Sequence, residues 1–121
     1  MANKKTLVLG ASSNPSRYSY LAINSLRTKG HEVIAIGKRG GKVGQVQVET
    51  EAKNINDLDT VTLYLNAGNQ KQYYDYIFSL HPKRIIFNPG AENEELSSKA
   101  RAKGILPQEA CTLVLLSTGQ Y

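Results

Sequence analysis

Short apolar runs alternate along the chain with longer stretches in which apolar residues recur at helical spacing. An apolar run of about four to eight residues between turn residues is typical of a buried strand, whereas apolar positions three and four residues apart indicate a helix. On this basis we predict strands at residues 6–9, 33–36, 61–65, 84–87 and 105–109. The same pattern predicts helices between them.

The first helix follows the first strand after a glycine turn. Its apolar positions are Tyr18, Leu21, Ala22, Ile23 and Leu26. Gly30 comes just past the last of them, where a glycine commonly ends a helix. We interpret Asn14 as the N-cap and Pro15 as the first helical position, since proline loses no hydrogen bond there.

Three more helices are expected further along the chain. A turn at residues 66–69, with Asn69 as the N-cap, leads into a helix that carries apolar residues on one side as far as Leu80. The helix after residues 88–91 begins with acidic residues and ends with basic ones before Gly104, which is the charge order that the helix dipole favours. Residues 112–117 are predicted to form a short closing helix.

Strands that alternate with helices through short connections indicate an α/β fold, a three-layer doubly wound parallel sheet. The first strand, helix and second strand form one right-handed crossover. Residues 37–44 contain too much glycine for regular structure, and residues 45–49 form either a short extra strand or an extended connection.

Composition adds limits to this picture. The 121 residues, 40% hydrophobic and 21% charged, predict that residues 1–121 form a single globular domain. The sequence contains no apolar stretch near the length of a membrane span, and Met1 to Gly10 lacks the features of a signal peptide. With Cys111 as the single cysteine, we expect a cytoplasmic protein that does not bind membranes.

The turn after the first strand is a candidate phosphate site. Residues 10–17 read Gly-Ala-Ser-Ser-Asn-Pro-Ser-Arg. Gly10 suits a tight turn before a helix, although Ser12 and Pro15 occupy the second and third glycine positions of the dinucleotide pattern. The serine hydroxyls and the Arg17 guanidinium can hydrogen-bond phosphate oxygens. A plain strand-to-helix turn without a ligand is the alternative.

Basic residues concentrate in the first third of the chain. The net charge is +5, and the residues up to Lys42 include eight basic side chains against one acid, Glu32. Lys38 and Arg39 follow the second strand, where an NAD-binding domain would place an acid against the ribose hydroxyls. They favour a phosphate on the adenosine ribose instead, as in NADP or coenzyme A. A mobile basic loop is the alternative.

Four loops should converge at the carboxyl ends of the strands, residues 10–17, 37–42, 66–69 and 88–91, and Gly68 belongs to the third. We predict no catalytic group and no metal site among them. His31 and His81 lie beside helix ends without partners at metal-ligand spacing, and the acids after residue 91 are explained as helix-start residues. Cys111 is either an inert thiol or lies near the thiol end of a bound ligand.

Two of these loops together resemble the small single-domain CoA-binding proteins, which have a Rossmann-like fold and are related to the CoA-binding domain of the succinyl-CoA synthetase α subunit. The residues that carry the resemblance are the run 10–17 and the run 88–95, Asn-Pro-Gly-Ala-Glu-Asn-Glu-Glu, and Cys111 is similar to the usual cysteine of the family. After the second strand the chain differs from the Val-Asn-Pro type sequence of that family and looks more like the synthetase loop.

The resemblance implies a role for each loop. It places Gly10, Ala11 and Ser12 at the pyrophosphate of CoA, and Asn14 and Arg17 at the same mouth. Pro89 and Gly90 shape the opposite wall, and Lys38 meets the ribose phosphate.

We therefore predict a single CoA-binding domain that binds coenzyme A or an acyl-CoA, a small-molecule nucleotide ligand, without catalysis of its own. The alternative is an NADP-dependent oxidoreductase module that needs a partner chain, because the sequence shows no substrate domain and no acid or base. Nucleic-acid binding is not favoured, since basic and aromatic residues do not cluster on any predicted strand. A protein partner or a homodimer remains open.

Overall fold

The computed structural model describes residues 3–121, which form one seven-stranded sheet with helices on both faces. The spatial order of the strands is β3-β4-β2-β1-β5-β6-β7, and all neighbours are parallel except β3 and β4. The strands are β1 (Thr6–Leu9), β2 (Val33–Ile36), β3 (Gly41–Val43), β4 (Val46–Glu49), β5 (Thr60–Leu63), β6 (Arg84–Phe87) and β7 (Leu106–Glu109). The order reverses between β1 and β5, as expected of a doubly wound sheet.

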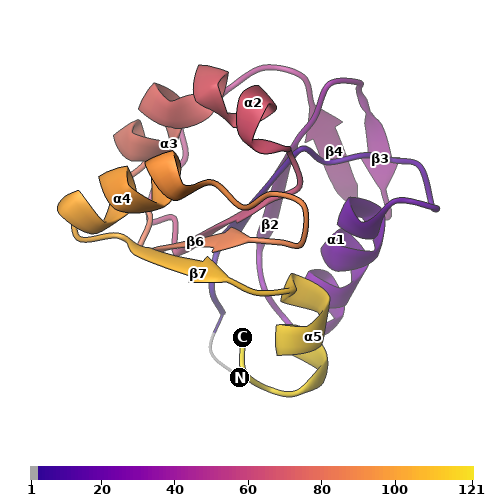
Figure 1. Cartoon of the computed structure of the whole chain (residues 1–121). Coiled ribbons are helices and arrows are strands. Elements are labelled where there is room, and N and C mark those ends of the chain that lie inside the picture. Colours follow the sequence, from indigo (N-terminus) through magenta and orange to yellow (C-terminus); the bar gives the residue numbers. More distant parts are fainter. Residues whose placement is uncertain (1–2) are drawn as a thin grey trace.

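The helices form two layers around the sheet (Figure 1). They are α1 (Tyr18–Thr28), α2 (Ala67–Gln70), the 3-10 helix η1 (Lys71–Tyr73), α3 (Tyr74–Ser79), α4 (Glu94–Ala102) and α5 (Thr112–Ser117). α1 and α5 cover one face, and α2, α3 and α4 cover the other. The predicted three-layer α/β fold is confirmed.

Each face of the sheet has its own apolar core, because alternate residues of a strand point to opposite faces. Leu7 and Leu9 of β1 pack in the core beneath α3 and α4, whereas Val8 packs with Ile23 of α1 and Leu116 of α5. All four residues of β1, of β5 and of β6 are buried. This burial on both faces agrees with the mostly apolar sequence of these strands, in which the polar exceptions are Thr6, Thr60, Thr62 and Arg84.

The expectation that residues 37–44 form no regular structure is wrong for part of that segment. Residues 41–43 form β3, which pairs antiparallel with β4 in a hairpin at the edge of the sheet. Glycine content weakens a strand but does not prevent pairing at an edge, where one neighbour suffices. The extra strand over residues 45–49 is confirmed as β4.

Two predicted helix starts are wrong. α1 begins at Tyr18 with Arg17 as its N-cap, because the Asn14 side chain instead accepts hydrogen bonds from the Ser16 N–H at 3.0 Å and the Ser16 hydroxyl at 2.9 Å. α2 begins at Ala67, since the Asn66 side chain accepts from the Asn69 N–H at 2.9 Å and is therefore the N-cap. The strand predicted at residues 61–65 ends at Leu63, two residues before its predicted end.

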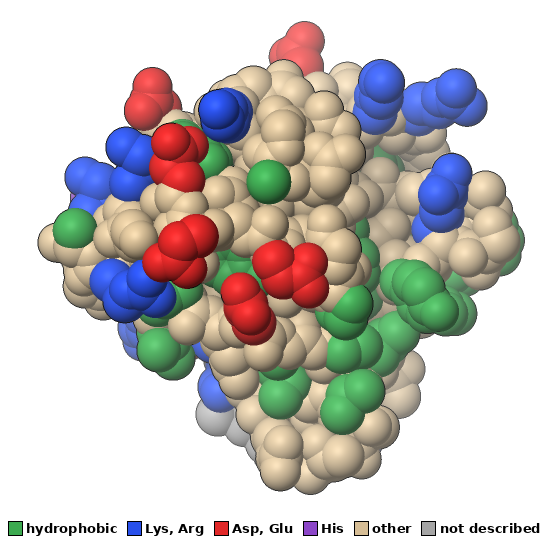
Figure 2. Space-filling model, viewed as in Figure 1, with side chains coloured by type: hydrophobic (Ala, Val, Ile, Leu, Met, Phe, Trp, Pro, Cys, Tyr) green, Lys and Arg blue, Asp and Glu red, His purple; other side chains and the backbone are tan. Residues whose placement is uncertain are grey.

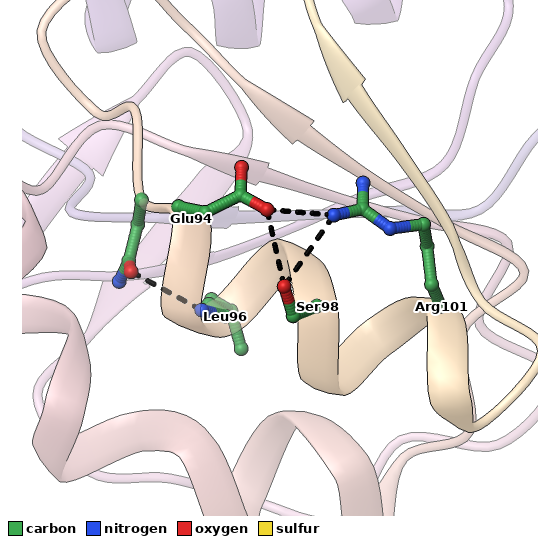
Figure 3. Close-up of polar contacts among 5 residues, drawn as sticks. Glu94, Leu96, Ser98 and Arg101 are labelled. Carbon is green, nitrogen blue, oxygen red and sulfur yellow. Dashed lines mark hydrogen bonds and ion pairs between the residues drawn. The ribbon is translucent and has the colours of Figure 1, made fainter.

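The charge order of α4 agrees with the prediction. Asn93 caps the helix by accepting from the Leu96 N–H at 3.1 Å, and the Glu94 carboxylate lies 2.8 Å from the Arg101 guanidinium and 3.1 Å from the Ser98 hydroxyl (Figure 3). The pair with Arg101 is exposed, so it contributes at most about 1 kcal/mol. The Glu94 carboxylate and the Asn93 side-chain oxygen therefore stabilise the helix itself.

Within residues 3–121, no helix is both long enough and apolar enough to cross a membrane.

Candidate functional site

A cavity of about 750 Å³ lies at the carboxyl ends of β1, β2, β5 and β6. Its lining includes nine of the ten predicted binding residues: Gly10, Ala11, Ser12, Asn14, Arg17, Lys38, Arg39, Pro89 and Gly90. The tenth, Gly68, is exposed on α2 and does not line the cavity. Three of the four predicted loops thus line the cavity as expected. The fourth loop, residues 66–69, contributes only Asn66 to the lining.

The floor of the cavity involves residues that the sequence did not single out. Tyr64 and Leu65 line it directly after β5, and Ser13 and Ala91 line it from the loops after β1 and β6. Tyr64 and Leu65 were assigned to the strand, because apolar and aromatic residues that continue a strand run give no signal of where pairing ends. Ser13 and Ala91 lie inside the loops that were recognised.

The loop after β1 is fixed by close backbone packing. Gly10 has φ +91°, and a Cβ there would lie 2.8 Å from the carbonyl oxygen of Tyr64. On its other side, a Cβ at Gly37 would overlap the carbonyl oxygen of Ala11. The N–H groups of Gly10 and Ala11 both donate to the Ile36 carbonyl at 2.9 Å. Only glycine permits these approaches, which hold the loop rigidly between β2 and β5.

Backbone donors at this loop remain available. Within residues 3–121, the N–H groups of Ser12 and Ser13 donate to no other group, and the Arg17 side chain does not cap α1. The first turn of α1 also contains no acidic residue. Ser12, Ser13 and the first residues of α1 all line the cavity, so unpaired N–H groups and the positive end of the α1 dipole lie beside it, an arrangement that suits an anion.

Three cations line the same cavity. Arg17, Lys38 and Arg39 are exposed at the cavity, and none of them forms an ion pair with a carboxylate of the described chain. Figure 2 shows Lys and Arg side chains gathered at the upper right of the molecule, around the region of β3 and β4. The cavity thus has a basic side at the end of β2.

The opposite wall is held by Asn88, which is buried at the end of β6. Its side-chain amide donates to the Leu63 carbonyl at 2.9 Å and the Thr62 hydroxyl at 2.7 Å, and its oxygen accepts from the Thr112 N–H at 2.9 Å. Pro89 and Gly90 follow directly, with Gly90 at φ +93°. This wall is therefore tied to β5 and to the start of α5.

Tyr64 contributes a buried hydroxyl. Its oxygen is shielded from solvent and lies beside the side chains of Thr62 and Thr112. Burial raises the pKa of Tyr64 well above its usual value, and the nearby Cys111 adds to the rise, so the phenol stays protonated. Cys111 itself is half-buried before α5 and does not line the cavity.

The histidines lie away from the cavity, consistent with their interpretation as turn residues. His31 is buried, and its Nδ1 accepts from the Lys4 N–H at 2.9 Å, so burial first and the Lys4 charge second lower its pKa. His81 is exposed with φ +50°. In the described chain no group of His, Cys, Asp or Glu side chains could hold a metal ion.

Comparison with known proteins places this geometry in context. The sequence model described as CoA binding domain matches residues 4–117. No curated protein matches the chain. Among solved structures, a protein described as uncharacterized is 50% identical over 100% of both chains, with a TM-score of 0.97.

Two more distant structures share the fold. A hypothetical protein from Pyrococcus horikoshii OT3 is 20% identical, with a TM-score of 0.86 over 96% of this chain and 83% of that one. A dinucleotide-forming acetyl-coenzyme A synthetase 1 from Ca. Korarchaeum cryptofilum, solved with phosphate and ADP, is 17% identical, with a TM-score of 0.69 over 87% of this chain and 25% of that one.

Proposed function

The chain belongs to the CoA binding domain family, and on that premise we propose that its cavity binds coenzyme A or an acyl-CoA and that the chain itself performs no reaction on it. The family is the one that the sequence resembles. Membership supports association with CoA in general. The assignment of individual residues to parts of the ligand is supported by the cavity.

The free donors at the start of α1 support a pyrophosphate position. The N–H groups of Ser12 and Ser13, the uncapped α1 terminus and the Arg17 guanidinium all lie at one side of the cavity. Each unpaired donor is stabilised by a phosphate oxygen, and the helix dipole adds to the attraction. This cluster of unused donors is the observation that carries the proposal.

The basic side of the cavity supports the position of the ribose phosphate. Lys38 and Arg39 line the cavity at the end of β2 and have no carboxylate partner in the described chain. The 3′-phosphate of CoA would supply one, and an arginine can contact it with two parallel hydrogen bonds. The pantetheine arm then extends across Tyr64 toward Pro89 and Gly90.

The proposal includes no catalysis because the described cavity lining contains no carboxylate, imidazole or thiol, so its serine hydroxyls have no carboxylate or imidazole in the lining to activate them. The same basic loop would also accept the 2′-phosphate of NADP, the ligand of an oxidoreductase module. CoA is preferred because the family premise applies to it and not to NADP.

A calorimetric titration tests the proposal. The ligand-stripped protein is titrated with CoA, with 3′-dephospho-CoA and with NADP under the same conditions. We expect saturable binding of CoA, about tenfold or more weaker binding of 3′-dephospho-CoA, since a phosphate with charged hydrogen bonds is lost, and weaker binding of NADP than of CoA, since NADP lacks the pantetheine arm. Binding of NADP without CoA would instead identify the oxidoreductase alternative.

A further inference from the structure

Gln70, at the end of α2, connects two of the loops that line the cavity. Its side chain is completely buried. The amide nitrogen donates to the Leu65 carbonyl and to the Ala91 carbonyl, each at 2.7 Å. Leu65 and Ala91 both line the cavity, one after β5 and the other after β6. A single amide group therefore joins the two loops.

The oxygen of the Gln70 amide is hydrogen-bonded as well. The Gln70 oxygen accepts from the Asn93 side-chain nitrogen at 2.8 Å, and the same nitrogen donates to the Tyr74 hydroxyl at 2.8 Å. Asn93 in turn caps α4. Reversing the amide would place its oxygen against two carbonyl oxygens, so these contacts permit one orientation only. The side chain is thus held from both ends.

The choice of glutamine is explained by the backbone atoms that it pairs. A leucine or methionine would fill the volume but leave the Leu65 and Ala91 carbonyls without their present donor, which is costly for buried acceptors. The two carbonyls that Gln70 satisfies belong to the cavity wall, and their separation is set by the two hydrogen bonds of one nitrogen. Gln70 itself is absent from the cavity lining.

We propose that Gln70 is a positioning residue for the part of the ligand beyond the pyrophosphate. It fixes the spacing between Leu65 and Ala91 and so shapes the wall against which the pantetheine arm packs. This inference rests on the proposed binding of CoA. In the described chain Gln70 forms no hydrogen bond with Lys38, Arg39 or the loop after β1, so the phosphate end of the site does not depend on it.

The test compares two ligands that share the phosphate end. CoA carries the pantetheine arm, whereas adenosine 3′,5′-bisphosphate lacks it. For Gln70→Leu, which removes both donors, we expect CoA affinity to fall about tenfold while the affinity for the bisphosphate changes less than twofold. Gln70→Glu keeps the length and shape of the side chain but loses the amide donors, and it is expected to give the same split.

Gln72→Leu is the matched control, because Gln72 is exposed in η1 and its side chain touches neither loop. It should bind both ligands as the wild type does. Unchanged CoA affinity in both Gln70 variants, or an equal loss for both ligands, would overturn the positioning role. Failure of the wild type to bind CoA would instead contradict the proposed function, so the two failures are distinguishable.

Discussion

The residues of the site form a rigid part and an exposed part. Gly10 and Gly37 fix the loop after β1 through backbone contacts that no other residue permits. Lys38 and Arg39 project from the end of β2 into solvent with no carboxylate partner in the described chain. The rigid part supplies directed N–H donors, and the exposed part supplies charge. Each part has its own measurable consequence.

Removing the charge at the end of β2 should weaken binding selectively. Lys38→Gln combined with Arg39→Gln is expected to lower CoA affinity about tenfold and to leave the affinity for 3′-dephospho-CoA nearly unchanged, because only the 3′-phosphate contacts are lost. Titration calorimetry measures both values. Lys42→Gln, on β3 and outside the cavity lining, is the control. An equal loss for both ligands would argue against this position of the phosphate.

The packing of Gly37 should be visible in stability. Gly37→Ala places a Cβ on the Ala11 carbonyl oxygen and 3.2 Å from the Val48 side chain, so the free energy of unfolding should fall by about 2 kcal/mol. Urea denaturation measures the change. Gly68→Ala is the control, since its Cβ would meet only Asn66 at 3.5 Å and alanine favours a helix by up to about 1 kcal/mol. A Gly37→Ala protein as stable as wild type would contradict the close approach.

Among the secondary-structure elements, the difference between α1 and α4 matters most for function. Asn93 caps α4 and two glutamates occupy its first turn, whereas α1 has neither a side-chain cap nor an acid. A helix terminus left unpaired at a cavity is available to an anionic ligand. The sequence between Gly10 and Arg17 therefore provides no side-chain cap for α1 at the position where we expect the pyrophosphate.

The elements that could be predicted from the sequence are those that are buried, because burial produces a recognisable pattern of apolar residues. The strands at 6–9, 33–36 and 84–87 have the predicted bounds, because each consists mostly of apolar residues and lies between two helical layers. β3 was missed because an edge strand needs no apolar run. The start of α1 was misplaced because Asn14 and Pro15 fit a cap in sequence, and only the Asn14 contacts with Ser16 reveal a separate turn.

The segment after α5 should stabilise the sheet through its last residue. Tyr121 is 5% exposed, its hydroxyl lies 2.6 Å from the Thr6 hydroxyl, and the Arg84 guanidinium lies 4.4 Å from its ring centre. Tyr121→Ala should lower the free energy of unfolding by about 3 kcal/mol, the usual cost of removing a buried aromatic ring. Thermal and urea unfolding provide the measurement.

Tyr18→Ala is the comparison for that experiment, because Tyr18 is 72% exposed. Its effect on stability should stay within about 0.5 kcal/mol. Similar losses for the two tyrosines would show that the segment after α5 does not contribute through the burial of Tyr121.

At the scale of the whole molecule, topology brings the site together. Loops that are far apart in the sequence meet because the parallel strands β1, β2, β5 and β6 all end at one edge of the sheet. The strand pattern was enough to predict this convergence. It could not identify Gln70, since a glutamine in a helix looks solvent-exposed in sequence and its partners, the Leu65 and Ala91 carbonyls, are backbone atoms.

Stability of the whole fold should depend on pH through His31. Burial and the Lys4 charge lower its pKa from the usual 6.5, so the unfolded chain binds more protons than the folded chain just below that pH. The contribution of His31 is therefore complete above pH 6.5 and decreases as the pH falls toward the lower pKa of the folded state. Urea denaturation between pH 8 and pH 5 measures the decrease.

His31→Gln should reduce this pH dependence between pH 6.5 and pH 5. An unchanged pH profile in His31→Gln would show that another group is responsible.

Amide chemical shifts during a CoA titration test the central claim most directly, since they report both binding and its location. The proposed site requires saturable shifts at the amides of Ser12, Ser13 and Gly90, with the amides at the end of α4 unchanged. Saturable shifts confined to another surface, or no shifts at millimolar CoA, would contradict the assignment of this cavity to coenzyme A.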